Sequence, residues 1–147
     1  MMLISHALGF KKESPIKYVS PDDTLGHAAK LLAENNIGAL PVSIDGMKIL
    51  GVLSERDIVK ALSSEGATLD SEVNLFMTIK VKKCKKTDLL RDVIKDMNKG
   101  HFRHIPVVDE SEQMIEFISI SDLVLAHLNE VEAENAAMRS TVSESPY

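Results

Sequence analysis

The sequence predicts a mixed α/β (α+β) fold in which one β-α-β-β-α unit occurs twice. A single shift of 65 residues (106 − 41) places Pro41-Val42 on Pro106-Val107 without gaps. The same shift places Ser54–Asp57 on Ser119–Asp122, and in both copies an apolar strand pattern runs into Ser-x-x-Asp where a helical pattern begins. Because each half of about 50 residues would bury little by itself, we expect two pseudo-symmetric repeats packed sheet to sheet, with helices outside and clefts between them.

The first repeat shows which strands and helices make up the unit. A strand is predicted over residues 17–19, and Ser20, Pro21 and Asp23 have the pattern of a helix N-cap, first position and third position. The buried face of this helix is predicted to be Leu25, Ala28, Ala29 and Leu32, which fall on Leu90, Val93, Ile94 and Met97 in the second copy.

The helix is expected to end near Asn35, Asn36 and Gly38. Strands over 40–44 and 49–53 follow, joined at the turn signal Asp45-Gly46. A second helix is predicted from Glu55 to about Ser63, with Ile58, Val59 and Leu62 at helical spacing.

The predicted organisation of the chain has five parts. They are an N-terminal lead-in (1–15), the first repeat (16–63), a linker (64–72), the second repeat (73–128) and a C-terminal helix extension and tail (129–147). Within them, a short helix is expected around Leu3 to Leu8, and another around Asp70 to Met77.

The composition restricts the class of protein. Of the 147 residues, 44% are apolar and 27% charged, a balance typical of globular domains. The net charge of −5 argues against nucleic-acid binding. The basic run Lys80 to Lys86 is interpreted as a solvated strand edge, or as a rim that attracts phosphate. No segment approaches 18 consecutive apolar residues, so no membrane partner is expected, and the single cysteine fits a reducing cytoplasm.

The repeated Ser-x-x-Asp has two interpretations. It is the pattern of a helix capping box, worth about 1 kcal/mol with no ligand present. It also places a carboxylate, a hydroxyl and the positive end of a helix dipole together, which suits the ribose and phosphate of a nucleotide. Arg56, inside the first copy, and Arg103 and His104, just before a buried strand, add groups that can bind phosphate.

Other side chains give weaker signals. Cys84 falls on Val19 in the repeat and is interpreted as a small apolar residue. His101 and His104 are three residues apart without a cysteine or carboxylate cluster, so no metal site is predicted. No catalytic motif is present, and His104 would be the one candidate base for an enzyme that acts on a nucleotide.

The last helix carries a second apolar pattern. Val124, Leu128, Val131 and Met138 follow a heptad-like spacing, with Asn135 at the polar step. Either this helix lies on its own domain, or it contacts a second subunit.

These residues together resemble a pair of CBS domains, the Bateman module. Met77-Thr78, Phe102 to Val108, Ile118 to Asp122 and the tail 130–134 are similar to the second repeat and C-terminal helix of stand-alone bacterial CBS-pair proteins. The chain departs from the usual family pattern at Glu116 and Ser121, where glycine is common, and at Ile79, where lysine is common. The resemblance implies a regulatory module without catalytic activity, a homodimer, and a bound adenosine nucleotide such as AMP, ADP, ATP or NAD(H).

The resemblance also implies ligand-binding residues. Ser54 and Asp57, with Ser119 and Asp122, would hold ribose hydroxyls. Arg56, Arg103 and His104 would face the phosphate, and Thr78, Lys80, Val81 and Ile105 would border the base and the second cleft. A partner protein would respond to the conformational change that nucleotide binding causes. The alternative is a ligand-free homodimeric assembly module that regulates its partner by contact alone.

Overall fold

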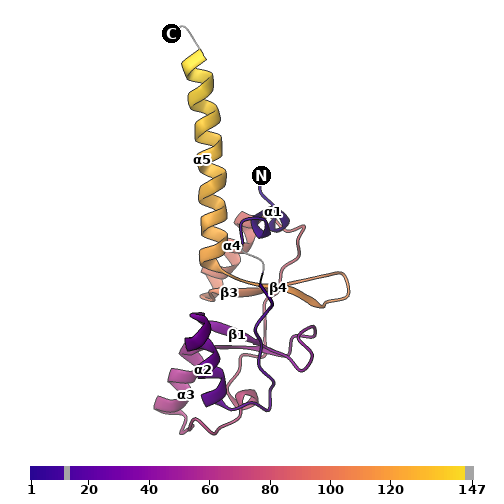
Figure 1. The fold of residues 1–147 in the computed structure, drawn as a ribbon, viewed down its shortest axis with the longest axis vertical. Helices are drawn as coiled ribbons and strands as arrows, with labels where there is room; N and C mark the ends of the chain where they lie inside the picture. Colours follow the sequence, from indigo (N-terminus) through magenta and orange to yellow (C-terminus); the bar gives the residue numbers. More distant parts are fainter. Residues whose placement is uncertain (12–13, 145–147) are drawn as a thin grey trace. The chain divides into compact units, whose positions relative to one another are not determined.

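The computed structural model describes residues 1–11 and 14–144, with side chains to 139. The chain divides into two compact units. The first comprises Met1–Glu13, Cys84–His104 and Ile118–Tyr147, and the second Ser14–Lys83 and Ile105–Phe117. Two small sheets and flanking helices confirm the predicted mixed fold (Figure 1).

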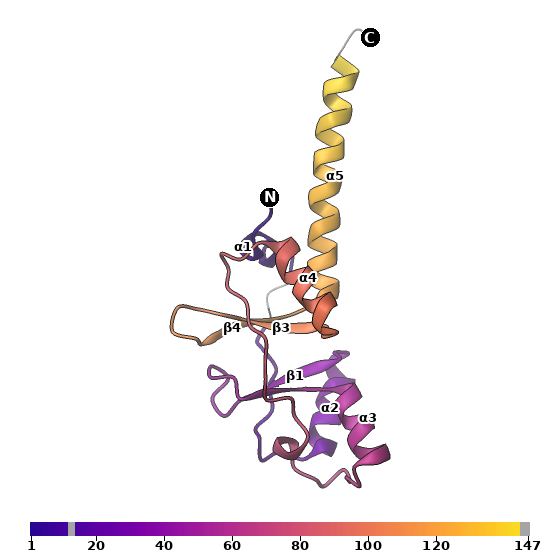
Figure 2. The same cartoon turned by 180° about the vertical axis from the view of Figure 1, so that it is seen from behind.

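The second unit contains the first repeat. Strands β1 (Ala39–Val42) and β2 (Gly51–Ser54) pair antiparallel, with Leu40 opposite Leu53. Helices α2 (Leu25–Asn35) and α3 (Glu55–Ser64) lie side by side against this sheet (Figures 1 and 2). The core between them is aliphatic, as a chain with few aromatic residues requires; it includes Leu25, Ala28, Leu32, Leu40, Leu53, Ile58 and Ala61. In α3 the buried face is therefore Ile58 and Ala61, while Val59 and Leu62 are exposed.

The repeat is preserved element by element. Helix α4 (Leu90–Gly100) begins 65 residues after α2 (90 − 25), and β4 (Met114–Ser119) ends 65 residues after β2 (119 − 54). Strand β3 (His104–Val108) pairs with β4, and helix α5 (Ile120–Glu144) follows. Asn36 and His101, again 65 apart (101 − 36), end α2 and α4 in the left-handed conformation. The sequence shift therefore corresponds to a real structural repeat.

Some predicted boundaries were wrong. Helix α2 is capped by the Thr24 hydroxyl, which accepts from the His27 N–H at 3.0 Å. Ser20 and Asp23 instead close a turn before the helix, with the Ser20 N–H donating to Asp23 Oδ2 at 2.8 Å. Residues 17–19 contribute only one isolated bridge, between Val19 and Val42.

Two further segments also differ from prediction. The basic run at 80–86 forms no strand and contributes one isolated bridge residue, Cys84. Of residues 70–77, only Val73–Leu75 is helical, as the 3₁₀ turn η1.

The helix starts are completed by segments distant in sequence. In the second unit, the N–H groups of Leu25 and Gly26 donate to the carbonyls of Ser71 and Leu69 at 2.9 and 2.8 Å. In the first unit, the Leu90 N–H donates to the Met2 carbonyl at 2.9 Å. Since the first N–H groups of a helix lack partners within it, the lead-in serves α4 as residues 69–71 serve α2. Helix α1 (Ile4–Leu8), which was predicted, belongs to this arrangement and contacts α5.

Cys84 in the first unit is buried, at 3% exposed, in agreement with its apolar interpretation. Burial, with a smaller contribution from the Asp88 carboxylate, raises the pKa of its thiol to about 12. The native state therefore keeps a proton that the unfolded chain loses above about pH 9, so this group's contribution to stability is lost as pH rises from about 9 to 12.

We expect thiol reagents at pH 8 to label Cys84 at least about a hundredfold more slowly in the native protein than in denaturant, because the thiolate is the reactive form. Labelling rates measured with and without urea test this. Native labelling within tenfold of the unfolded rate would contradict the burial of this side chain.

Candidate functional site

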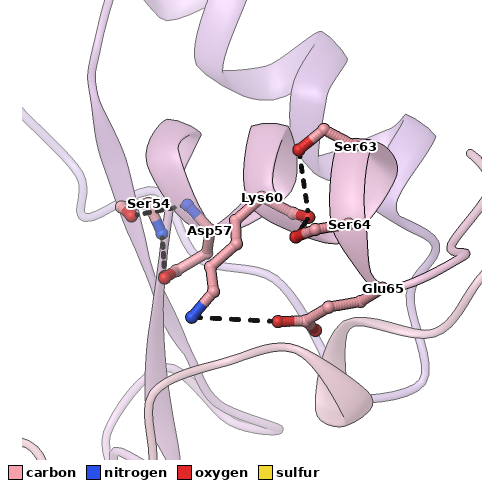
Figure 3. A network of polar contacts seen from close by, with 6 residues as sticks. All are labelled: Ser54, Asp57, Lys60, Ser63, Ser64 and Glu65. Atoms are coloured by element: carbon pink, nitrogen blue, oxygen red, sulfur yellow. Dashed lines mark hydrogen bonds and ion pairs between the residues drawn. The ribbon is translucent and has the colours of Figure 1, made fainter.

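Two strand-to-helix junctions of the same construction carry the predicted ribose-binding residues. At the first, the Ser54 N–H donates to Asp57 Oδ2 at 2.9 Å, and the Asp57 N–H donates to Ser54 Oγ at 3.1 Å (Figure 3). At the second, the Ser119 N–H donates to Asp122 Oδ2 at 3.1 Å, and the Asp122 N–H donates to Ser119 Oγ at 3.2 Å. Both pairs are reciprocal capping boxes, and each satisfies two N–H groups at a helix start.

The capping role leaves part of each carboxylate available. The hydrogen bonds that the described residues make to Asp57 and Asp122 reach Oδ2, so Oδ1 can accept from another donor. Both aspartates are partly exposed, at the positive end of a helix dipole. One oxygen can thus cap the helix while the other binds a hydroxyl group, so the two interpretations of Ser-x-x-Asp are compatible.

Figure 3 also shows Lys60, in the middle of α3, and Glu65, its C-cap. Lys60 Nζ lies 3.9 Å from Glu65 Oε1, and the Lys60 carbonyl accepts from the hydroxyls of Ser63 and Ser64. This exposed network stabilises the end of the helix by little. None of these four residues was predicted as a site residue, and we assign them no part in the site.

Thr78 is placed beside the first junction by strand β2. The Thr78 N–H donates to the Val52 carbonyl at 2.8 Å, and the Val52 N–H donates to the Thr78 carbonyl at 3.0 Å. A side chain on Gly51 would meet Met77 Sδ at 2.7 Å and the Thr78 carbonyl at 2.9 Å, so this glycine permits the close approach. Sequence reasoning missed Gly51, although a glycine inside a strand often signals a close backbone contact.

The remaining predicted residues of the second unit differ in exposure. Arg56, in the first turn of α3, and Lys80 are exposed, while Val81 is partly buried. Ile105 is buried and belongs to the core.

Arg103 lies at the second junction. Its carbonyl accepts from the Ile120 N–H at 2.8 Å, next to the Ser119–Asp122 box. In the first repeat the equivalent carbonyl belongs to Gly38, which accepts from the Glu55 N–H at 2.9 Å. Since glycine performs the same backbone role, that role does not require the arginine side chain, which is exposed. His104, which follows it, begins β3 and is partly buried.

The structure thus groups the predicted residues by unit. The first unit holds Arg103, His104, Ser119 and Asp122, and the second holds Ser54, Arg56, Asp57, Thr78, Lys80, Val81 and Ile105.

His101 forms the left-handed end of α4, which accounts for a polar residue at that position. Within residues 1–11 and 14–144, no group of three or more His, Cys, Asp or Glu side chains could hold a metal ion.

The duplicated unit, with a capped helix at each strand end, defines a tandem CBS-domain protein, and the family comparison agrees. The model of the CBS domain matches residues 12–64 and 71–129. The chain therefore belongs to the CBS-domain family.

Relatives support this assignment. The chain is 33% identical to a CBS-domain containing protein of known structure from Agrobacterium tumefaciens, with a TM-score of 0.78 over 86% of this chain and 99% of that one. It is 35% identical over 111 residues to an uncharacterised 17.7 kDa protein of Acidianus ambivalens, covering 76% of this chain and 66% of the relative.

None of the described helices is long and apolar enough to cross a membrane.

Two more distant structures share the fold and contain ligands. A CBS domain protein from Pyrobaculum aerophilum was solved as a complex with AMP; it is 23% identical, with a TM-score of 0.70 over 82% of this chain and 89% of that one. A CBS domain pair 22% identical to this chain, with a TM-score of 0.74 over 88% of this chain and 98% of that one, was solved with 5-methylthioadenosine and S-adenosyl-L-methionine.

Proposed function

We propose that this protein is a regulatory CBS-pair module that senses an adenosine nucleotide, AMP or a related ligand such as ADP, ATP or NAD(H). The observation that carries the proposal is the duplicated capping box, in which one aspartate oxygen caps the helix and the other can accept from a ribose hydroxyl. Such a carboxylate-to-hydroxyl bond is charge-assisted and therefore strong. The adenosine ligands of the distant CBS structures support this choice of ligand class.

Each junction also has one arginine that could bind the phosphate, but the two arginines occupy different positions in the repeat. Arg56 stands at the first junction, where its equivalent in the second repeat is Ser121. Arg103 stands at the second junction, where its equivalent is Gly38. The two junctions thus offer a similar ribose acceptor but a differently placed guanidinium, so we expect them to differ in affinity for a given nucleotide.

The nucleotide would act by binding one conformation of the protein more tightly than another. A regulated partner protein would read that shift in population, and the protein would work as a homodimer in the cytoplasm. In this function the protein would use no catalytic residue and no metal.

A thermal-shift series on nucleotide-stripped protein tests the proposal, with AMP, ADP, ATP, NADH and S-adenosylmethionine as separate ligands. At a hundredfold excess over its dissociation constant, a ligand of the folded state adds about 2.7 kcal/mol. That free energy raises the Tm of a domain of this size by roughly 5–10 °C. No shift with any of the five ligands would contradict a nucleotide sensor.

The second candidate function is an assembly module without a ligand. Two observations favour it: both capping boxes are complete without a ligand, and α5 has an exposed apolar face. The absorbance spectrum of the purified protein separates the two candidates. Because the chain has no tryptophan and two tyrosines, bound nucleotide would be plain near 260 nm. Nucleotide co-purifying with the protein would count against the assembly module.

Replacement of Arg103 tests the phosphate contact. We expect Arg103→Ala to weaken AMP binding by about 10- to 100-fold, the value of a hydrogen bond to a charged group, and to leave adenosine binding unchanged. Calorimetric titration with both ligands measures this difference. Arg91→Ala removes an exposed arginine of the same unit as the matched control. Equal losses for AMP and adenosine would contradict a phosphate role for Arg103.

A further inference from the structure

Helix α5 has two apolar faces, and its own unit buries only one of them. Leu123 and Ala126 are buried where α5 contacts α4 and α1. At about 100° per residue, Leu128 lies about 140° around the helix from Leu123. The second face, which we call the α5 stripe, is exposed: Val124 (42%), Leu128 (51%), Val131 (36%) and Met138 (66%), with the exposed Asn135 between the last two.

Both views show α5 extending well beyond α1 and α4 (Figures 1 and 2). The stripe therefore begins on the part of the helix that is packed in the unit and continues along the part that is not. A free helix of this kind is marginal in water, since most helical stability in proteins comes from packing an apolar face. Val131 lines a surface hollow with Met1, Met2 and Leu89 of its own unit, and the rest of the stripe lacks a partner in the described part of the chain.

The spacing of the stripe is that of a two-stranded coiled coil. Steps of four and three residues alternate from 124 to 138, which is the 3.5-residue period of the a and d positions. Leu128 and Asn135 take a positions, and Val124, Val131 and Met138 take d positions.

Asn135 indicates that the partner is an identical helix. A buried asparagine at an a position needs a polar partner, because an unpaired amide in an apolar seam is costly. In a parallel, in-register pair, Asn135 meets Asn135 of the second copy, an arrangement that fixes register in coiled coils. In an antiparallel pair, a positions face d positions, so the amide would face an apolar residue such as Val131 or Met138.

The flanking residues point to the same orientation. In a parallel pair, each g residue faces the e residue five positions later on the other helix. Glu134 at g then faces Arg139 of the second copy, and His127 at g faces Glu132 of the second copy. Ile120 at g faces the exposed Leu125 at e, so the 120–125 pair is apolar and the 134–139 pair is complementary in charge.

We propose that α5 pairs with α5 of a second copy of this chain as a parallel, in-register coiled coil along the α5 stripe. The inference gives an interface to the homodimer named in the proposed function, and it does not depend on nucleotide binding.

Disulfide trapping in the full-length protein tests the orientation. Val131→Cys places two thiols at facing d positions in the parallel pair, and mild oxidation is expected to cross-link it. Ala133→Cys, on the exposed outer face, is the matched control and should stay uncross-linked. Cys84 is buried and should give no background. Cross-linking of Val131→Cys no greater than that of the control would overturn the proposal, even if the protein dimerises through another surface.

Charge substitutions test the seam and its register by sedimentation equilibrium. Leu128→Glu puts two like charges in the seam and is expected to make the protein monomeric, while Ala133→Glu adds the same charge outside the seam and should leave it dimeric. A dimeric Leu128→Glu, or a monomeric wild-type protein, would overturn the proposal.

Arg139→Glu is expected to weaken the dimer by about threefold to tenfold through like-charge contact with Glu134 of the second copy. Adding Glu134→Arg should restore it. Residues five apart do not face each other on one helix, so restoration reports contact between copies. Failure to restore would contradict the parallel register.

Discussion

Asparagine in place of Asp57 and Asp122 is expected to weaken nucleotide binding strongly while leaving the fold in place. The carboxamide oxygen can still accept the Ser54 or Ser119 N–H that the carboxylate now accepts at 2.9 or 3.1 Å. The other oxygen becomes an NH₂ group, which cannot accept from a ribose hydroxyl. Losing a hydrogen bond to a charged group weakens binding by about 10- to 100-fold at each occupied junction. Titration of each single variant shows which junction binds the ligand.

The chain provides a matched control in each unit. Asp23 and Asp88 close turns with the same geometry, their Oδ2 atoms accepting from Ser20 and Lys85 N–H groups at 2.8 Å. Asp23→Asn and Asp88→Asn therefore remove the same charge from a similar turn without touching a junction. Unchanged affinity in the double variant of Asp57 and Asp122, or an equal loss in the controls, would remove the ribose assignment. Asparagine is preferred to alanine because alanine would also break the capping box.

Alanine in place of Ile4 is expected to lower the free energy of unfolding by about 2–5 kcal/mol, the usual cost of truncating a fully buried isoleucine. Ile4 is fully buried in the first unit, and its N–H donates to the Asp88 carbonyl at 2.9 Å. Since domains are stable by only about 5–15 kcal/mol, this loss would be a large fraction of the total. Urea denaturation followed by circular dichroism measures it.

Ile44→Ala is the matched control, because Ile44 is 74% exposed. It should change the free energy of unfolding by less than about 0.5 kcal/mol. Similar midpoints for the Ile4 and Ile44 variants would show that the lead-in is dispensable for the stability of the first unit.

The sequence by itself determined the repeat and the two junctions. Serine and aspartate three residues apart at a strand end have few local alternatives to a capping box, so the motif and its geometry coincide at Ser54 and Ser119. The ends of α2 and α4 could also be predicted from the sequence. Asn36 tolerates the left-handed conformation, and the 65-residue shift of the repeat places Asn36 on His101.

Tertiary structure decided what depends on distant partners. Pattern alone favoured Ser20 as the cap of α2; the helix starts later, where Thr24 caps it and the carbonyls of residues 69–71 meet its first N–H groups. The lead-in had no visible partner in the sequence, yet Met2 hydrogen-bonds to Leu90, the first residue of α4, and Ile4 to Asp88 just before it.

The last helix was predicted either to lie on its own domain or to contact a second subunit. These alternatives differ in which side of α5 its own unit covers. That choice depends on packing, and the structure buries Leu123 and Ala126 while the α5 stripe stays exposed. A local motif fixes its own hydrogen bonds within a few residues. Which surface is buried depends on contacts between segments far apart in the chain, and periodicity alone does not contain that information.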